Sequence, residues 1–427
     1  MTAAGSMFGL AFGDCMGKPT EFQRFEEIVR LYGPQGPSVL PPGGLVTDDT
    51  QMALAVADAL LEQPEGAELA VEPFTASLIE HFLAWAKSPD NNRAPGMTCL
   101  RAIGNLGNGL SWPEATQRGS KGCGANMRVT PIGLLPQASE TTIAGAAQLQ
   151  AALTHGHATG LAASDLTAFA TRWLAQGMAP SDLVPALRER CQEQRRIYHG
   201  DWLGDDLWRV PMRNSPEEFI EAGWVECGMI LGVLARAAEN PDPAVDPCDY
   251  TGEGWIAEEA LATALLCFLM YHDEPVRALG RAAATGGDSD SIAALAGAFL
   301  GARHGLEAFP ADWPEQIEYR ERLARLVPRG MRDVRERHRV RGLASGRQRE
   351  PVPDDHPSGS GIGRGRRRRD RGRSPAQAAV LRRGTSGAAT GRLIETWSRS
   401  DQPMRSVEGG GALSQSPLRA LATIAWT

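Results

Sequence analysis

The sequence feature that most limits the fold is a pair of apolar segments in which glycine recurs every fourth residue. Residues 5–17 read GSMFGLAFGDCMG, and residues 292–301 read IAALAGAFLG. This spacing puts the glycines on one face of a helix, where the missing side chains let another backbone approach closely. Helices that are apolar all round are buried. Because strand-type alternation is nearly absent up to residue 328, the sequence predicts one all-α domain.

Helical periodicity predicts the main elements of this domain. The segment 198–215 instead reads as an aromatic-rich loop, whose tryptophans either pin it to the core or wall a pocket. The predicted helices span residues 22–32, 51–61, 69–87, 96–109, 141–178 with a break at 154–157, 181–197, 216–239, 252–270, and a last amphipathic helix within 306–326.

The chain has two parts of opposite charge. Residues 1–328 carry 23 basic and 42 acidic residues, whereas residues 329–427 carry 21 arginines, no lysine and 9 acids. An acidic body argues against nucleic-acid binding by the body. The second part is rich in Gly and Ser and poor in aliphatic residues, so we predict a disordered tail over 329–427. Nucleic acid or another anionic surface could be contacted only through Arg364–Arg373, and an extension of the reading frame without function explains the tail equally well.

Cysteine usage and hydropathy bear on the compartment. The seven cysteines are scattered, odd in number and without a C-x-x-C pair, which argues for a reducing compartment. The first residues lead straight into a motif-like segment, which leaves no room for a secretory signal, and the longest apolar run is too short to span a bilayer. We therefore expect a cytoplasmic protein with no membrane association.

Two acidic segments carry the strongest chemical signal. Residues 286–291 read GGDSDS before one apolar helix, and residues 47–50 read TDDT before another. Asp, Ser and Thr are preferred helix caps, so either segment alone reads more simply as a cap. Capping needs only one carboxylate, however, and several at the mouth of a buried helix repel one another. The pair therefore predicts a shared cation site, and all-oxygen ligands suit Mg²⁺, Mn²⁺ or Ca²⁺.

Two further segments are weaker signals. Residues 119–128 read GSKGCGANMR, a glycine-rich loop whose N–H groups, with the dipole of a following helix, could hold a diphosphate. A plain turn explains that loop as well. His155 and His157 are two residues apart, so on a helix they would point apart and would not share a metal. Glu21 alone reads as a solvated loop acid.

Read together, these segments resemble the ADP-ribosylglycohydrolase family from about Gly5 to Leu326. The resemblance implies an orthogonal bundle of helices around a central site for two divalent cations, Mg²⁺ or Mn²⁺, which cleaves the glycosidic bond between ADP-ribose and an acceptor. It rests on six segments in the family's order, which are GLAFGDCMGKPTEF, LVTDDTQM, GCGANMRVTPIG, the TH of THGHATG, GEGWIAEEAL and GGDSDSIAALAGAFLGARHG.

The resemblance also implies roles for individual residues, each at the position that matches a family motif. Glu21 lies beside the metals, and Glu21 or Asp290 would accept a proton from the attacking water. Ser289 and Ser291 stand where Thr is common, and Cys123 stands where many members have Asn. The implied metal ligands are Thr47, Asp48, Asp49, Asp288, Asp290 and Ser291, and the implied substrate-binding residues are Gly122, Gly124, Ala125, Asn126, Met127 and His155.

Three functions remain open at this point. The first is a hydrolase acting on an ADP-ribosylated protein or a small ADP-ribosyl compound, with arginine favoured as acceptor because bacterial family members often act on it. The second is a module that binds ADP-ribose without turnover. The intact set of acids argues against this second function. The third is a structural body that carries a nucleic-acid-binding tail. No feature of the sequence indicates an oligomeric state.

Overall fold

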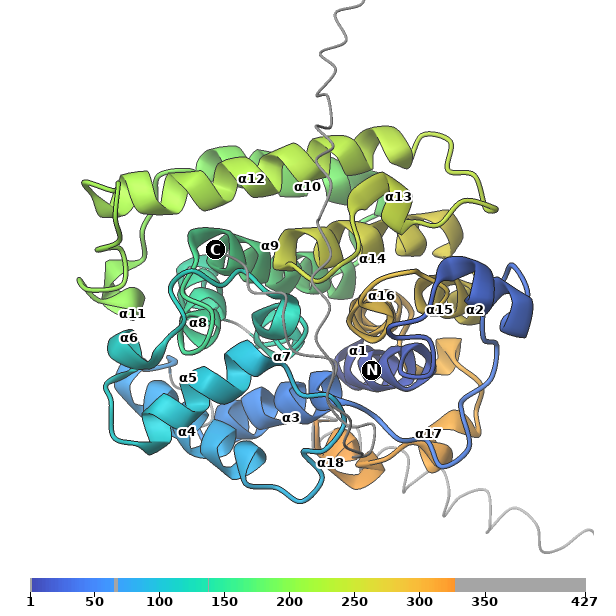
Figure 1. The fold of residues 1–427 in the computed structure, drawn as a ribbon, viewed down its shortest axis with the longest axis horizontal. Coiled ribbons are helices and arrows are strands. Elements are labelled where there is room, and N and C mark those ends of the chain that lie inside the picture. The colour runs from blue at the N-terminus through green and yellow to red at the C-terminus, as the bar shows by residue number, and fades with distance from the viewer. Residues whose placement is uncertain (1, 65–67, 137, 327–427) are drawn as a thin grey trace, which may run out of the picture. The chain divides into compact units, whose positions relative to one another are not determined.

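The structure is a computed structural model that describes residues 2–64, 68–136 and 138–326 (Figure 1). These residues form helices joined by loops and contain no strand, which confirms the predicted all-α fold. The tail predicted over 329–427 lies outside the described residues. The first elements are α1 (Thr2–Gly17), α2 (Phe25–Tyr32), α3 (Asp48–Leu61), α4 (Val71–Ala86), α5 (Met97–Gly107), α6 (Trp112–Ala115), η1 (Cys123–Ala125), α7 (Thr130–Gly133), α8 (Glu140–Ala152) and α9 (Ala158–Ala175). They are followed by α10 (Pro180–Glu193), α11 (Gly200–Leu203), α12 (Pro216–Ala237), α13 (Cys248–Thr251), α14 (Ala257–Tyr271), α15 (Pro275–Ala283), α16 (Ser289–His304), η2 (Leu306–Ala308), α17 (Trp313–Gln316) and α18 (Arg320–Arg325).

Most predicted helices are present with ends shifted by a few residues, and three differences have clear causes. Residues 252–256 form an irregular segment with a bend instead of a helix, because Gly252 and Gly254 take φ values of 98° and 84°. The last predicted helix is broken into η2, α17 and α18, because Pro310 separates η2 from α17 and Tyr319, with a left-handed φ of 56°, separates α17 from α18. Helix α15 was not predicted. Its nine residues begin at a proline and are too short for a distinct periodic signal.

The centre of the described fold is an antiparallel contact between α1 and α16. A Cβ on Gly9 would overlap the carbonyl oxygen of Gly297, and a Cβ on Gly5 would overlap the backbone at Gly301. At the other end of α1, a Cβ on Gly17 would overlap the backbone at Ser289. The sequence predicts that another backbone approaches the glycine face of each segment. In the structure, each of the two segments is the partner of the other. Only glycine permits this separation, because any side chain would push the helices apart.

Other helices wrap this central pair and bury both members almost completely (Figure 1). Helices α14 and α15 pack on α16, α3 packs on α1, and α9 lies against α8, α12 and α16. At one side of α1, the Phe12 ring meets Phe309 and Trp313 edge-on, with centroids 5.2 Å and 5.3 Å away. These aromatic contacts fasten the chain after α16 back onto the first helix.

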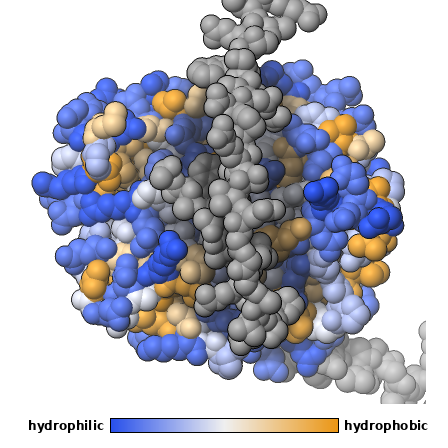
Figure 2. All heavy atoms as spheres, viewed as in Figure 1, coloured by the Kyte–Doolittle hydropathy of each residue, from blue (hydrophilic) through white to orange (hydrophobic). Residues whose placement is uncertain are grey.

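The outer surface is polar, as expected for a chain that buries its apolar residues in one core. On the face shown in Figure 2, the described residues are mostly hydrophilic, with apolar residues in small scattered groups. Within the described parts, no helix has the length and apolar character needed to cross a membrane.

The α1–α16 contact predicts opposite effects of one substitution at two helical glycines. Gly9→Ala places a Cβ against the Gly297 carbonyl, so we expect a loss of about 1–3 kcal/mol of unfolding free energy or more. Gly104→Ala on α5 meets nothing within 4 Å, so helix propensity should leave stability unchanged or raise it by about 0.5–1 kcal/mol. Urea unfolding of both variants measures the difference, and equal stabilities would refute the close contact.

Candidate active site

The start of α16 presents two carboxylates. Gly287 is held against the Glu253 carbonyl oxygen, which also accepts a hydrogen bond of 2.8 Å from the Asp288 N–H. Asp288 occupies the cap position, but its side chain makes no capping bond. Asp290 Oδ1 accepts from the Ser291 N–H at 3.0 Å. The Asp288 carboxylate is therefore not used to cap its own helix, and Asp290 keeps one oxygen free of the bond to Ser291.

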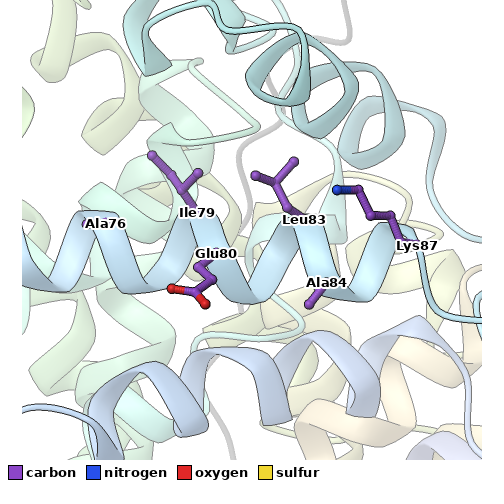
Figure 3. A pocket seen from close by; sticks show the side chains of 6 residues that line it. All are labelled: Ala76, Ile79, Glu80, Leu83, Ala84 and Lys87. Atoms are coloured by element: carbon purple, nitrogen blue, oxygen red, sulfur yellow. The ribbon is translucent and has the colours of Figure 1, made fainter.

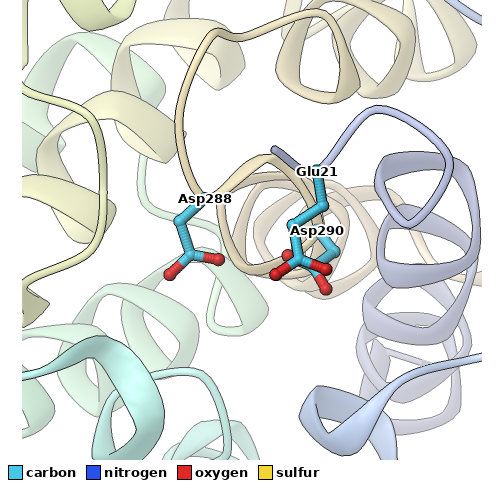
Figure 4. A group of neighbouring side chains, drawn as sticks. All are labelled: Glu21, Asp288 and Asp290. Carbon is cyan, nitrogen blue, oxygen red and sulfur yellow. The ribbon is translucent and has the colours of Figure 1, made fainter. Parts of the chain in front are cut away.

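Glu21 joins these two carboxylates from the end of α1. The chain turns after α1, and the Glu21 N–H donates to the Gly17 carbonyl at 3.0 Å. One oxygen each from Glu21, Asp288 and Asp290 lies within 4.8 Å of the others. Figure 4 shows the three carboxylates directed at the same space beside the start of α16. The structure thus brings together acids that lie some 270 residues apart in the chain.

The start of α3 is fixed by Asp14, a residue that the sequence analysis did not single out. Its buried carboxylate accepts from the Thr47 N–H and Oγ1 at 2.9 Å and 2.8 Å, and from the Thr50 N–H and Oγ1 at 3.0 Å and 2.5 Å. A carboxylate from another helix therefore caps α3 together with Thr47, its N-cap. The signal in the sequence is one acid within an otherwise apolar, buried helix.

Asp48 and Asp49 face the cluster from this fixed helix start. Asp48 Oδ2 accepts from the Gly96 N–H at 3.2 Å. Asp49 Oδ1 is buried and has no hydrogen-bond partner among the described residues. The negative charge of Asp290 contributes to the raised pKa of both groups, which indicates that the two acidic segments share one site.

Burial is the main cause of high pKa values throughout the cluster, and the charge of Asp290 is the next. Together they raise the pKa of Glu21 to about 9 and those of Asp14 and Asp48 to about 7. The candidate donors are all oxygens, and one buried carboxylate oxygen lacks a partner. This donor set fits a hard divalent cation, whose charge would hold these groups ionised.

The two serines of the GGDSDS segment have different environments. Ser289 Oγ lies 3.0 Å from Thr20 Oγ1 and donates to the Gly17 carbonyl at 3.1 Å, so it ties α16 to α1. Ser291 Oγ instead lies 3.9 Å from Met127 Sδ, on the side of the glycine loop. Of the two, Ser291 is therefore the hydroxyl placed between the acidic segment and that loop.

The glycine loop is anchored on residues 252–256, called the strap below, and on the start of α14. The Cys123 N–H donates to the Trp255 carbonyl at 3.0 Å, and the Ala257 N–H donates to the Lys121 carbonyl at 2.9 Å. Asn126 Nδ2 donates to the Ala257 carbonyl at 3.0 Å. A further anchor missed in the sequence is Lys121 itself, which forms ion pairs with two glutamates, Glu226 at 2.8 Å and Glu258.

One expectation for the loop needs correction. The helix that follows, α7, is a single turn that starts at Thr130, so it supplies little of the expected dipole. The N–H groups of Asn126 and Met127 both donate to the Cys123 carbonyl, at 2.6 Å and 3.1 Å. Ala125 accepts at its carbonyl from Gln150 Nε2 at 2.9 Å. These bonds give the loop a fixed shape, while the substrate contacts of these residues stay a prediction.

His155 lies beneath this loop. A Cβ on Gly124 would come within 3.0 Å of His155 Cε1, and one on Gly122 within 3.3 Å of Nε2. Burial and the nearby Arg128 charge lower the pKa of His155 to about 3, so the ring is neutral. Its Nδ1 lies 2.8 Å from Thr154 Oγ1, which accepts a 2.8 Å hydrogen bond from Arg128. The two glycines are thus the positions where the loop rests on the histidine ring.

Two surface hollows lie away from the acidic cluster. One runs along the outer side of α4 between Ala76 and Lys87 (Figure 3). A second, between α4, α6 and α11, includes Trp112 and Trp202 in its lining. Trp202 is also packed against Gly145 of α8. This tryptophan therefore both fastens the aromatic-rich loop to the core and lines a hollow. None of the acidic cluster lines either hollow.

The cluster predicts how stability depends on pH when no cation is present. Carboxyl groups with raised folded-state pKa values bind more protons in the folded chain than in the unfolded chain above about pH 4. In a chelator, the unfolding free energy should therefore fall as pH rises from 5 to 8, through the pKa of about 7 for Asp14 and Asp48. Saturating Mg²⁺ should remove most of this fall. Denaturant unfolding at each pH measures it, and stability that rises with pH in chelator would contradict the arrangement.

Comparison with known proteins shows the family of the chain. A model of the ADP-ribosylglycohydrolase family matches residues 2–342. The chain is 27% identical to ADP-ribosylhydrolase ARH3 of Xenopus tropicalis, over 74% of this chain and 90% of that protein. It is 25% identical to ADP-ribosylarginine hydrolase Tri1 of Serratia proteamaculans (strain 568), over 76% of this chain and 77% of that protein. A solved structure described as an ADP-ribosylglycohydrolase-related protein complex shares the fold, with a TM-score of 0.53 and 24% identity over 76% of this chain and 95% of that one. The chain belongs to the ADP-ribosylglycohydrolase family, whose members are hydrolytic enzymes.

Proposed function

We propose that residues 1–328 form a hydrolase that uses divalent cations to cleave the bond between ADP-ribose and an acceptor, with an arginine side chain as the favoured acceptor. The observation that carries this proposal is the convergence of Glu21, Asp288 and Asp290 within 4.8 Å. The relative named as an ADP-ribosylarginine hydrolase supports the choice of arginine. All seven cysteines are unpaired, which supports a reducing, cytoplasmic setting.

Two Mg²⁺ or Mn²⁺ ions would be held at this site by the two acidic segments. When bound, such ions supply Lewis acidity that lowers the pKa of water and orients hydroxyl groups of the substrate. Asp14 would keep the first segment in place by fixing the α3 start. The proposed ligands are Thr47, Asp48, Asp49, Asp288, Asp290 and Ser291.

Glu21 is the residue to which we assign the proton transfer. Its side chain is only partly buried, so it can exchange protons with solvent, whereas Asp290 is buried and already accepts from the Ser291 N–H. A water oxygen forms a bond to C1″ of the ribose while the bond from C1″ to the acceptor breaks. Glu21 takes one proton from that water, and the other hydrogen stays on the new C1″ hydroxyl. The proton held by Glu21 then passes to the departing acceptor, so charge and atoms balance.

The glycine loop would bind the diphosphate of the substrate. Gly122 and Gly124 have no side chains, and His155 supports both from below as a neutral ring. Backbone N–H groups suit phosphate oxygens, and they add no counter-charge that would compete with the cations. Ala125, Asn126 and Met127 would set the shape of the loop.

The proposed hydrolysis is tested by release of ADP-ribose from an arginine-ADP-ribosylated protein, with Mg²⁺ and with chelator. Glu21→Gln should lower kcat by about 10²–10⁴-fold, because the proton acceptor is lost. Asp288→Asn/Asp290→Asn should abolish both release and ion binding, whereas Glu80→Gln on the outer side of α4 should change neither. If the protein binds ADP-ribose in a metal-dependent way but releases it from no linkage, the protein is a binding module and not a hydrolase.

The two serines provide a matched pair of variants. Ser291→Ala removes a proposed ligand and should weaken Mg²⁺ binding roughly tenfold or more, as seen by calorimetry. Ser289→Ala removes the bonds to Thr20 and Gly17 and should instead cost about 1 kcal/mol of stability with unchanged ion affinity. The reverse result would exchange the roles of the two hydroxyls.

A further inference from the structure

Two exposed aromatic side chains stack beside the acidic cluster. The rings of Phe22 and Trp255 have centroids 5.5 Å apart and planes 17° apart. They keep 69% and 39% of their surface exposed, so their outer parts remain available to a ligand. Neither ring belongs to the hydrophobic core of the described residues or packs against it.

The pair spans the two sides of the proposed site. Phe22 directly follows Glu21, whose carboxylate belongs to the cluster. Trp255 lies in the strap. Its carbonyl accepts from Cys123 of the glycine loop, and the neighbouring Gly254 lies against the Asp288 side chain. The two rings therefore adjoin both the acidic cluster and the glycine loop.

The backbone of Phe22 supports a role beyond folding. Its φ of 64° is in the left-handed region, which is unfavourable for a residue with a bulky side chain. The conformation turns an apolar ring outward, where it gains only the stack with Trp255. Strain retained beside a reactive cluster is typical of residues that contact ligands.

On the basis of the proposed function, we propose that Phe22 and Trp255 form the acceptor-binding surface and select a planar cationic acceptor, the guanidinium group of an ADP-ribosylated arginine. The two rings are exposed beside buried carboxylates, and an acceptor that belongs to another protein must stay on the solvent side of the bond that breaks. A guanidinium group is planar, weakly hydrated and stacks on aromatic faces. A serine acceptor offers no such plane.

The charges around the pair complement a cation. Trp255 Nε1 donates to Glu253 Oε2 at 3.1 Å, which places a carboxylate at the edge of the indole ring. Glu253 is exposed, and the body as a whole is strongly acidic. A cationic side chain is therefore attracted to this surface and can pair with Glu253 while it lies against the rings.

The test compares arginine-linked and serine-linked ADP-ribosyl peptides of otherwise equal sequence. Phe22→Gly suits the positive φ and keeps the chain folded, and Trp255→Ala removes the other ring. Each should lower kcat/KM on the arginine-linked peptide about tenfold, mainly through KM, and change the serine-linked value less than about twofold. Trp255→Tyr should restore most of the loss. Leu61→Ala is the matched control, since it removes an exposed apolar residue roughly 20 Å along α3 from Asp48.

Calorimetry with free ADP-ribose separates this role from its alternatives. An unchanged Kd in the two variants is expected. A weaker Kd would mean that the rings bind the nucleotide, and equal losses on both linkages, or none, would also overturn the proposal. If the unaltered protein hydrolyses neither peptide, the proposed hydrolase fails separately. In that case, the Kd of the arginine-linked peptide is compared with the Kd of ADP-ribose in the unaltered protein and in both variants. Tighter binding of the peptide that is lost with either ring supports the role of the pair, and peptide binding that the variants leave unchanged overturns it.

Discussion

The close contact of α1 with α16 is the interaction on which both the core and the site depend. Because the two helices run antiparallel, the end of α1 meets the start of α16, and Glu21 comes to lie beside Asp288 and Asp290. Thr20 Oγ1 secures this junction through the Gly17 and Ala283 carbonyls and Ser289 Oγ. A side chain in place of the glycines would therefore separate the carboxylates as well as the helices.

The site concentrates negative charge at a place that the fold has already made rigid. Asp14 is a member of α1 and caps α3, so the central helix also orients the second acidic segment. Burial and mutual repulsion make this arrangement unfavourable without a cation, which the high pKa of Glu21 expresses. The surrounding apolar core supplies the stability that allows such a cluster to persist, as is common for sites that bind ions.

The parts that sequence predicts best are those with local patterns. Long periodic helices and the two acidic helix starts were identified because caps, turns and apolar spacing lie within a few residues of one another. Local patterns do not predict the roles of Asp14, Lys121 and the Phe22–Trp255 stack, because these residues contact partners far along the chain. The predicted helix extends over the strap because the segment from Ala257 onward is rich in Ala and Leu, while two glycines with positive φ decide the path of the strap.

The same central contact has a consequence for how the chain is made. Helix α1 is synthesised before the other described helices and is almost wholly apolar, yet the partner that covers its glycine face ends only at His304. For most of translation this first helix has no native neighbour along that face. Native closure must then wait for a contact between segments almost 290 residues apart, which slows folding and leaves α1 open to chaperones and to premature association.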